Sequence, residues 1–62
     1  MTVKIKSISP HIKTNFQIKV GDQFEVVEKD NYGYYIKAYF KHSNREDKLG
    51  TVYFEKDEVH VL

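Results

Sequence analysis

The most informative run of this sequence is Tyr34-Tyr35-Ile36-Lys37-Ala38-Tyr39-Phe40. Aromatic and β-branched residues at this density favour a β-strand, because they fit a pleated, half-buried surface. Successive side chains of a strand point to opposite faces. The inward face is predicted to carry Tyr34, Ile36, Ala38 and Phe40, and the outward face to carry Tyr35, Lys37, Tyr39 and Lys41.

Further strands are predicted on both sides of this run, at residues 2–8, 23–29, 51–54 and 59–61. The alternation of side chains in them is typical of a strand and not of a helix. The residues expected to share a face within a strand are Val3 with Ile5, Phe24 with Val26, and Val52 with Phe54. Strands at this regular spacing indicate an all-β domain, built as a small barrel or as two packed sheets.

Turn residues separate the predicted strands. Gly21-Asp22 predicts a tight turn, because glycine takes a positive φ freely and aspartate bonds to its own local backbone. The sequence Asp30-Asn31-Tyr32-Gly33 predicts a hairpin loop in which asparagine and glycine supply left-handed backbone.

The remaining connections have distinct characters. Residues 11–15 are predicted to form a loop after Pro10, because proline ends the preceding strand. The next segment is expected to be extended and to bury Phe16, Ile18 and Val20. Residues 42–48 are all polar and are predicted to be mobile, and residues 55–58 are predicted to make one tight helical turn.

From Val20 onward, the order of these signals resembles that of an Src-homology-3-like barrel. The sequence Lys19-Val20-Gly21-Asp22-Gln23-Phe24 resembles the diverging turn of that family. Tyr35-Ile36-Lys37-Ala38 stands where the family has a paired aromatic dipeptide and a buried alanine, and Gly50-Thr51-Val52 resembles the entry to its fourth strand. The single helical turn at 55–58 and the closing strand follow in the family's order, and residues 7–20 would form its first large loop.

This resemblance implies a five-stranded barrel with one short helical turn before the last strand. It also places Tyr35 at the position of the family's ligand-contacting tryptophan. This chain has no tryptophan, its first loop is basic, and no proline follows Gly50. Recognition of proline-rich peptides, which depends on an aromatic-lined groove, is therefore not expected.

The candidate binding residues are Tyr35, Lys37, Tyr39, Lys41 and Tyr53, extended by Tyr32 from the adjoining loop. Three interpretations are open. Cross-strand tyrosines can simply stabilise a sheet, they can form a protein interface, or they can stack nucleic-acid bases between lysines. A protein partner ranks ahead of nucleic acid, because the net charge is only +1 and the chain has nine lysines but one arginine, the residue best suited to reading bases. Homodimerisation is also open.

Length and composition limit the function further. Sixty-two residues predict a single domain, 1–62, with no room for an enclosed substrate cavity. No nucleophile motif or phosphate loop is present, so we expect no enzyme and no cofactor. The three histidines, His11, His42 and His60, lack metal-binding spacing, and the acidic turn 55–58 lacks the features of a calcium loop, so no metal is expected.

The charge is unevenly distributed along the chain. Residues 1–20 carry four lysines and no acid, whereas residues 21–62 carry a net charge of −3. Such separation can steer a charged partner, although the two parts can also face each other in the folded chain. The opening residues alternate apolar and charged side chains, unlike a signal peptide or a membrane span, so a cytosolic location is expected. The function we expect is that of a non-catalytic binding module. The cysteine-free, lysine-rich and arginine-poor composition fits an accessory protein of a phage or mobile element.

Overall fold

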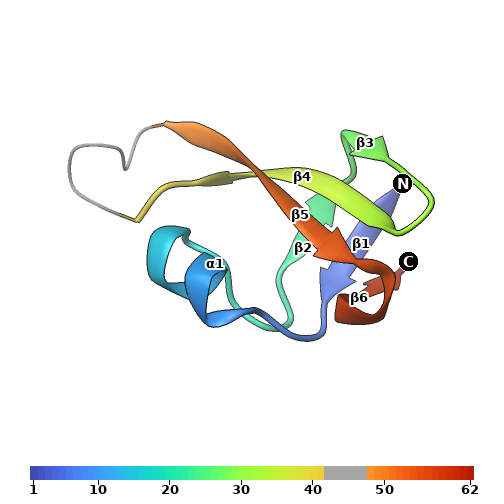
Figure 1. Ribbon diagram of the computed structural model, residues 1–62, viewed down its shortest axis with the longest axis horizontal. Coiled ribbons are helices and arrows are strands. Elements are labelled where there is room, and N and C mark those ends of the chain that lie inside the picture. The colour runs from blue at the N-terminus through green and yellow to red at the C-terminus, as the bar shows by residue number, and fades with distance from the viewer. Residues whose placement is uncertain (42–47) are drawn as a thin grey trace.

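The computed structural model describes residues 1–41 and 48–62, and it shows a mostly β chain (Figure 1). The elements, in chain order, are β1 (Thr2–Ile5), α1 (Pro10–Asn15), β2 (Gln23–Glu25), β3 (Glu28–Lys29), β4 (Gly33–Tyr39), β5 (Leu49–Glu55), the 3₁₀ turn η1 (Lys56–Glu58) and β6 (Val59–Val61). The described strands form two antiparallel sheets, with the orders β2-β1-β6 and β3-β4-β5. Neither sheet closes on itself among these strands. The prediction of a β domain is therefore confirmed in its coarse form, whereas the predicted single barrel of five strands is not, because the described strands form two separate sheets.

The long strands β4 and β5 cross over the other sheet, and α1 lies beneath their far end (Figure 1). The core fills the space between these layers and is entirely apolar among the described residues. Its buried side chains are Val3, Ile5, Ile18, Ile36, Ala38, Val52, Phe54 and Val59. Burial of apolar surface of this kind stabilises a fold by roughly 25 cal/mol per Å².

The alternation predicted for residues 34–40 is confirmed for residues 36–39, whereas Tyr34, Tyr35 and Phe40 are all half-buried. Ile36 and Ala38 are buried, at 0% and 3% exposure, while Lys37 and Tyr39 between and beyond them are exposed. The same alternation holds in β5, where Val52 and Phe54 are buried. The sequence pattern therefore identifies the inward face of both long strands.

The predicted strand at residues 23–29 is broken rather than continuous. The Val26 N–H donates to the Met1 carbonyl beside β1, at 2.8 Å, whereas the Val27 N–H donates to the Tyr35 carbonyl in β4, at 2.9 Å. Consecutive residues thus bond to different sheets. A bend at this point divides the expected strand into β2 and β3 and carries the chain from one sheet to the other.

The loop predicted for residues 11–15 is wrong, because this segment forms the short helix α1. Pro10 stands in its first turn, where its missing N–H costs nothing and its fixed φ suits a helix. The helix ends when the Phe16 N–H donates to the Ile12 carbonyl, at 2.9 Å. Ile12 also packs against the core, which helps to hold a helix too short to be stable alone.

The expected burial of Phe16, Ile18 and Val20 is only partly correct. Ile18 is buried, Phe16 is half-buried and stacks on Phe40 with ring centroids 4.7 Å apart, and Val20 is 65% exposed. The chain turns immediately after Val20, at Gly21, which has a φ of +98° as predicted for a tight turn. That turn directs the Val20 side chain away from the core.

The hairpin predicted at residues 30–33 is present, but its expected left-handed backbone is not. Gly21 is the one residue of the described chain with a positive φ, so neither Asn31 nor Gly33 has the left-handed backbone. The turn is closed instead by Asp30, whose Oδ1 accepts hydrogen bonds from the N–H groups of Tyr32 and Gly33, each at 2.8 Å.

The helical turn predicted at residues 55–58 is confirmed as η1. Glu55 and Glu58 cap each other's backbone N–H groups there, and the Glu55 N–H donates to Glu58 Oε1 at 2.9 Å. The polar connection predicted at residues 42–48 lies, up to residue 47, outside the described part of the chain.

Candidate functional site

The outward side of β4 and β5 is built from residues that lie directly opposite each other. The register pairs Tyr35 with Tyr53, Lys37 with Thr51, and Tyr39 with Leu49. At the two ends of the ladder, the Lys56 N–H donates to the Tyr32 carbonyl and the Phe40 N–H donates to the Lys48 carbonyl, each at 3.1 Å. Hydrogen-bonded and non-hydrogen-bonded pairs alternate in an antiparallel ladder, so these outward pairs are of the non-hydrogen-bonded kind, in which side chains lie closest together.

Tyr35 and Tyr53 form the centre of this surface. Their ring centroids are 4.8 Å apart and the ring planes are tilted by 53°. Both side chains are half-buried, since each ring covers part of the other. Such a cross-strand aromatic pair stabilises the two strands and also offers a firm apolar surface.

Asp30 fixes the hydroxyl end of this pair. The Tyr53 hydroxyl donates to Asp30 Oδ1 at 3.2 Å, so this oxygen receives the Tyr53 bond in addition to the two backbone bonds of the hairpin. The bond from the Tyr32 N–H is the main reason why the pKa of Asp30 lies below its ordinary value. Desolvation, followed by the neighbouring Asp30, raises the pKa of Tyr53 to about 12. Tyr53 therefore stays a neutral hydrogen-bond donor at physiological pH.

Gly33 makes this arrangement possible, and sequence reasoning assigned it the wrong role. A Cβ at this position would collide with the Phe54 carbonyl oxygen and with the ring and hydroxyl of Tyr53. Glycine is thus required for the close approach of β4 to β5, and the left-handed backbone expected of it is absent. No pattern in the sequence alone distinguishes these two uses of glycine.

The other end of the surface is less enclosed. Lys37 lies along it, with its ammonium group donating to Thr51 Oγ1 at 2.8 Å. Beyond it, the opposed side chains of Tyr39 and Leu49 are 49% and 53% exposed. This pair has no covering element among the described residues.

We define the tyrosine face by these three opposed pairs: Tyr35, Lys37, Tyr39, Leu49, Thr51 and Tyr53. Four of the predicted binding residues, Tyr35, Lys37, Tyr39 and Tyr53, come together in it. Leu49 and Thr51 were missed, although the register of the hairpin would have identified them once the pairing was known.

The two other predicted residues lie outside these three pairs. Tyr32 is 76% exposed in the loop between β3 and β4. Lys41 lies toward α1, where its ammonium group donates to the Lys13 carbonyl at 3.1 Å. The simple alternation of a strand did not predict this, because β4 ends at Tyr39, two residues before Lys41.

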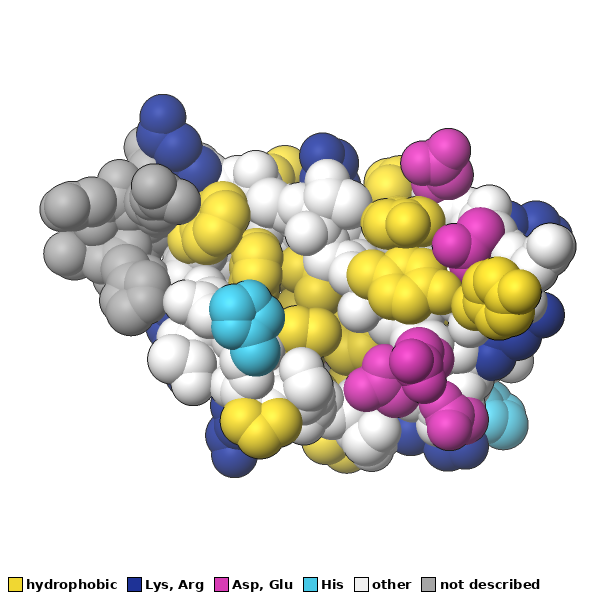
Figure 2. Space-filling model, viewed as in Figure 1, with side chains coloured by type: hydrophobic (Ala, Val, Ile, Leu, Met, Phe, Trp, Pro, Cys, Tyr) yellow, Lys and Arg dark blue, Asp and Glu magenta, His cyan; other side chains and the backbone are white. Residues whose placement is uncertain are grey.

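Acidic side chains surround one end of the tyrosine face. Glu28 lies opposite Tyr35 on β3, and Glu55 follows Tyr53 by two residues on β5. Figure 2 shows hydrophobic side chains gathered between two groups of acidic side chains, at the end where the β3–β4 hairpin and η1 lie. The surface is therefore aromatic and apolar, with negative charge beside it.

The described histidine, aspartate and glutamate side chains form no group of three or more that could hold a metal ion. Of the helices in residues 1–41 and 48–62, none has the length and apolar character needed to cross a membrane.

Comparison with known proteins yielded no relative. No family model, no curated protein and no solved structure matches the chain.

Proposed function

We propose that this chain is a small, non-catalytic binding module that contacts a partner protein through the tyrosine face. The observation that carries this proposal is the exposed pair of Tyr39 and Leu49 on the same sheet surface as the stacked Tyr35 and Tyr53, with the Lys37–Thr51 pair between them. Apolar and aromatic side chains that gather on one sheet surface are typical of interaction sites.

The surface is also organised before any partner arrives. The ring contact and the Asp30 bond hold Tyr53, and the Thr51 bond holds Lys37. Immobilising a free side chain on binding costs about 0.5–1.5 kcal/mol, so side chains that are already ordered reduce this cost. Tyrosine adds large contact area with few rotatable bonds.

We propose further that the two sheets are the halves of an Src-homology-3-like barrel. The strand order supports this, because β6 pairs with β1 across from β2, while the bend after β2 leads into the β3-β4-β5 sheet. The helical turn η1 precedes the last strand, as the resemblance implies. On this basis, Tyr35 would occupy a ligand-contacting position.

A protein partner fits the charges better than nucleic acid does. Lys37 is the one cation among the six residues of the face, and it is bonded to Thr51. Glu28 and Glu55 stand beside the tyrosine pair and would repel phosphates. Stacking on the tyrosines without neutralisation of phosphate would leave nucleic acid with weak binding. We also propose a cytosolic location and an accessory role in a phage or mobile element, both on the basis of composition.

Affinity capture from lysate of the native host tests the proposed function. The chain would be immobilised beside a Tyr39→Ser/Leu49→Ser variant and a Val61→Ser control, which removes an apolar side chain of similar exposure from the other sheet. We expect one captured protein to be lost with the double variant and retained with the control. Retention at high salt is also expected, because an apolar contact does not release counterions.

Two results would contradict the proposed function. In the first, the Val61→Ser chain loses the captured protein while the Tyr39→Ser/Leu49→Ser chain keeps it. Alternatively, an electrophoretic shift assay could show that the chain retains single- or double-stranded nucleic acid and that Tyr39→Ser/Leu49→Ser releases it. Measuring the mass of the chain in solution would show whether the partner is a second copy.

A further inference from the structure

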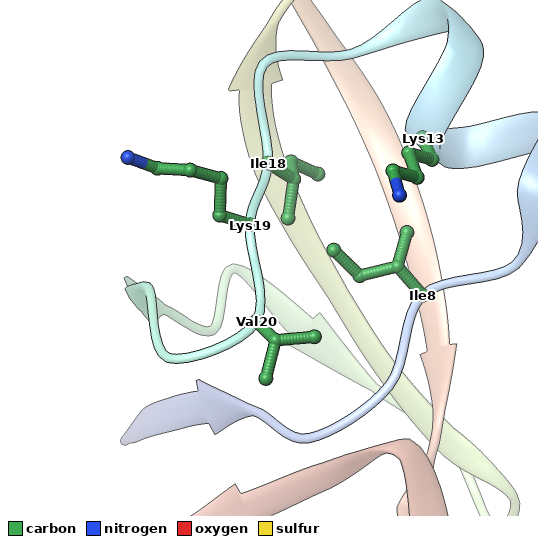
Figure 3. Close-up of a pocket in the computed structure, with 5 residues that line it drawn as sticks. All are labelled: Ile8, Lys13, Ile18, Lys19 and Val20. Carbon is green, nitrogen blue, oxygen red and sulfur yellow. The ribbon is translucent and has the colours of Figure 1, made fainter.

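A hollow of about 310 Å³ lies between the segment before α1 and the segment after it. We call this hollow the lysine pocket, and its lining residues are Ile8, Lys13, Ile18, Lys19 and Val20 (Figure 3). Ile18, at 5% exposure, belongs to the core, and Ile8 is half-buried against it. Val20 is 65% exposed. Figure 3 shows the Ile18 and Ile8 side chains pointing toward each other between Lys13 and Lys19.

A second hollow, of about 350 Å³, shares Ile18 and Lys19 with the lysine pocket. Its other lining residues include Phe16 and Lys41. The bond from the Lys41 ammonium group to the Lys13 carbonyl holds this further cation beside α1. Three lysines from different parts of the chain therefore gather around one apolar floor.

Nothing in the described chain neutralises these lysines. Among residues 1–41 and 48–62, none of the ammonium groups of Lys13, Lys19 and Lys41 has a carboxylate within ion-pair distance. The acid nearest to Lys19 along the sequence is Asp22, whose carboxylate accepts a bond of 2.9 Å from the Lys19 backbone N–H and so closes the turn at Gly21. The lining of both hollows contains lysine but no aspartate or glutamate.

The pocket therefore combines two requirements for an occupant. Its apolar floor favours binding of an apolar group, because each methylene removed from water contributes about 0.8 kcal/mol. The lysines would stabilise negative charge on both sides of that group, because Lys19 extends away from Ile18 on one side while the Lys13 ammonium group lies on the other, toward Ile8 (Figure 3). A free inorganic anion would meet the second requirement only.

An extended acidic peptide meets both requirements, whereas a nucleic acid does not. The lysine pocket is lined by aliphatic side chains and by no aromatic ring on which a base could stack. In the neighbouring hollow, the Phe16 ring is already stacked on Phe40. Aspartate or glutamate around a leucine-like residue supplies both charge and an apolar side chain.

We propose that the lysine pocket binds an extended acidic segment of a partner protein. An apolar side chain of that segment enters between Ile8 and Ile18, and carboxylates beside it contact Lys13 and Lys19. This site lies on the connection between β1 and β2 and shares no residue with the tyrosine face. The proposal for the lysine pocket is therefore independent of the function proposed for the tyrosine face.

The test is a titration of the isotope-labelled chain, followed by amide chemical shifts, with a short synthetic peptide in which glutamate alternates with leucine. A glutamine–leucine peptide and oligothymidylate serve as comparison probes. We expect saturable shifts centred on Ile8, Ile18 and Lys19 with the acidic peptide. We expect the Lys13→Glu/Lys19→Glu variant to bind the acidic peptide at least about tenfold more weakly than the parent chain does.

A matched variant separates local from overall charge. Lys4→Glu/Lys29→Glu changes the net charge equally but alters exposed lysines on β1 and β3, so it should keep most of the affinity. Circular dichroism of both variants would establish that the fold is retained, which is expected because all four lysines are exposed.

The proposal is overturned if the acidic peptide does not bind, if the glutamine–leucine peptide binds equally well, or if the two variants lose the same affinity. Tighter binding of oligothymidylate at Ile8 and Ile18 would also overturn it, in favour of nucleic acid. Shifts centred on Tyr35 and Tyr53 would show that the peptide uses the tyrosine face instead.

Discussion

The tyrosine face and the lysine pocket differ in how the chain holds them. The face lies on two paired strands, and Tyr53 and Lys37 in it are held by the Tyr53–Asp30 and Lys37–Thr51 bonds. The pocket lies on the irregular segments around α1, and its ammonium groups reach solvent without carboxylate partners among the described residues. One surface has side chains held by contacts within the molecule, whereas the other leaves the charge of its lysines available.

This difference separates two ways of binding. A preorganised aromatic surface gains affinity by apolar burial, which depends little on salt. Unpaired lysines around a hollow accelerate encounter with an acidic partner, and this effect weakens as the ionic strength rises. A single small domain can hold both because they occupy different segments of the chain.

The largest difference in stability between the two regions is expected when one glycine in each is replaced by alanine. Gly33→Ala should lower the free energy of unfolding by about 3 kcal/mol, because the new Cβ meets the Phe54 backbone, which has little freedom to move. Gly21→Ala, in the turn near the pocket, has open space around it and should cost only about 1–2 kcal/mol for its positive φ. Urea denaturation of both variants measures this, and equal losses would show that β4 and β5 can separate at Gly33.

The hydrogen bond at the edge of the tyrosine face has a smaller expected effect. Tyr53→Phe removes the donor to Asp30 and should lower the free energy of unfolding by less than Gly33→Ala does, while leaving the ring contact with Tyr35 in place. Tyr34→Phe is the control, since its half-buried ring lies in the same strand pair and its hydroxyl has no hydrogen-bond partner in the described residues. A loss as large in Tyr34→Phe would contradict the role assigned to Asp30.

Alkaline pH should loosen the same corner of the tyrosine face. The pKa of Tyr53 is raised from 10.0 to about 12 in the folded chain, so its contribution to stability is complete below pH 10 and is lost as the pH rises toward 12. Ultraviolet titration should show a late ionisation step, from Tyr53, near pH 12. In Asp30→Asn the late step should move toward ordinary values, and a late step that is unchanged would contradict the contribution of Asp30.

Acid should have the smallest effect, and it should also act at Asp30. The backbone bonds from Tyr32 and Gly33 hold the pKa of this carboxylate below its ordinary value of 3.8. Its stabilisation is therefore present above that value and is lost as the pH falls through the lower, folded value. Glu25, whose pKa is lowered chiefly by the Thr2 hydroxyl, contributes in the same direction. Denaturation midpoints of Asp30→Asn and the parent chain should converge at low pH, and a constant gap would exclude this origin.

Sequence reasoning predicted the parts of the fold that depend on alternation. Ile36, Ala38, Val52 and Phe54 follow a period of two, and burial of one sheet face enforces that period. This is why four of the six predicted binding residues were found on one surface. The barrel itself stays a prediction, because the described sheets remain separate.

The errors arise where tertiary contacts override local signals. Pro10 was interpreted as the end of a strand, although it also starts a helix that Ile12 attaches to the core. Lys41 leaves the strand alternation because α1 offers its ammonium group a carbonyl acceptor. The sequence pattern does not predict the lysine pocket for the same reason, since its residues meet only when the segments before and after α1 come together.

The bend between Val26 and Val27 has a mechanical consequence. Because neighbouring N–H groups donate to opposite layers, neither layer can detach without pulling on a backbone segment anchored in the other. Melting should accordingly occur in a single step, with amides of β1 and β4 exchanging with deuterium through one shared opening. A partner that clamps either layer would then slow exchange in both.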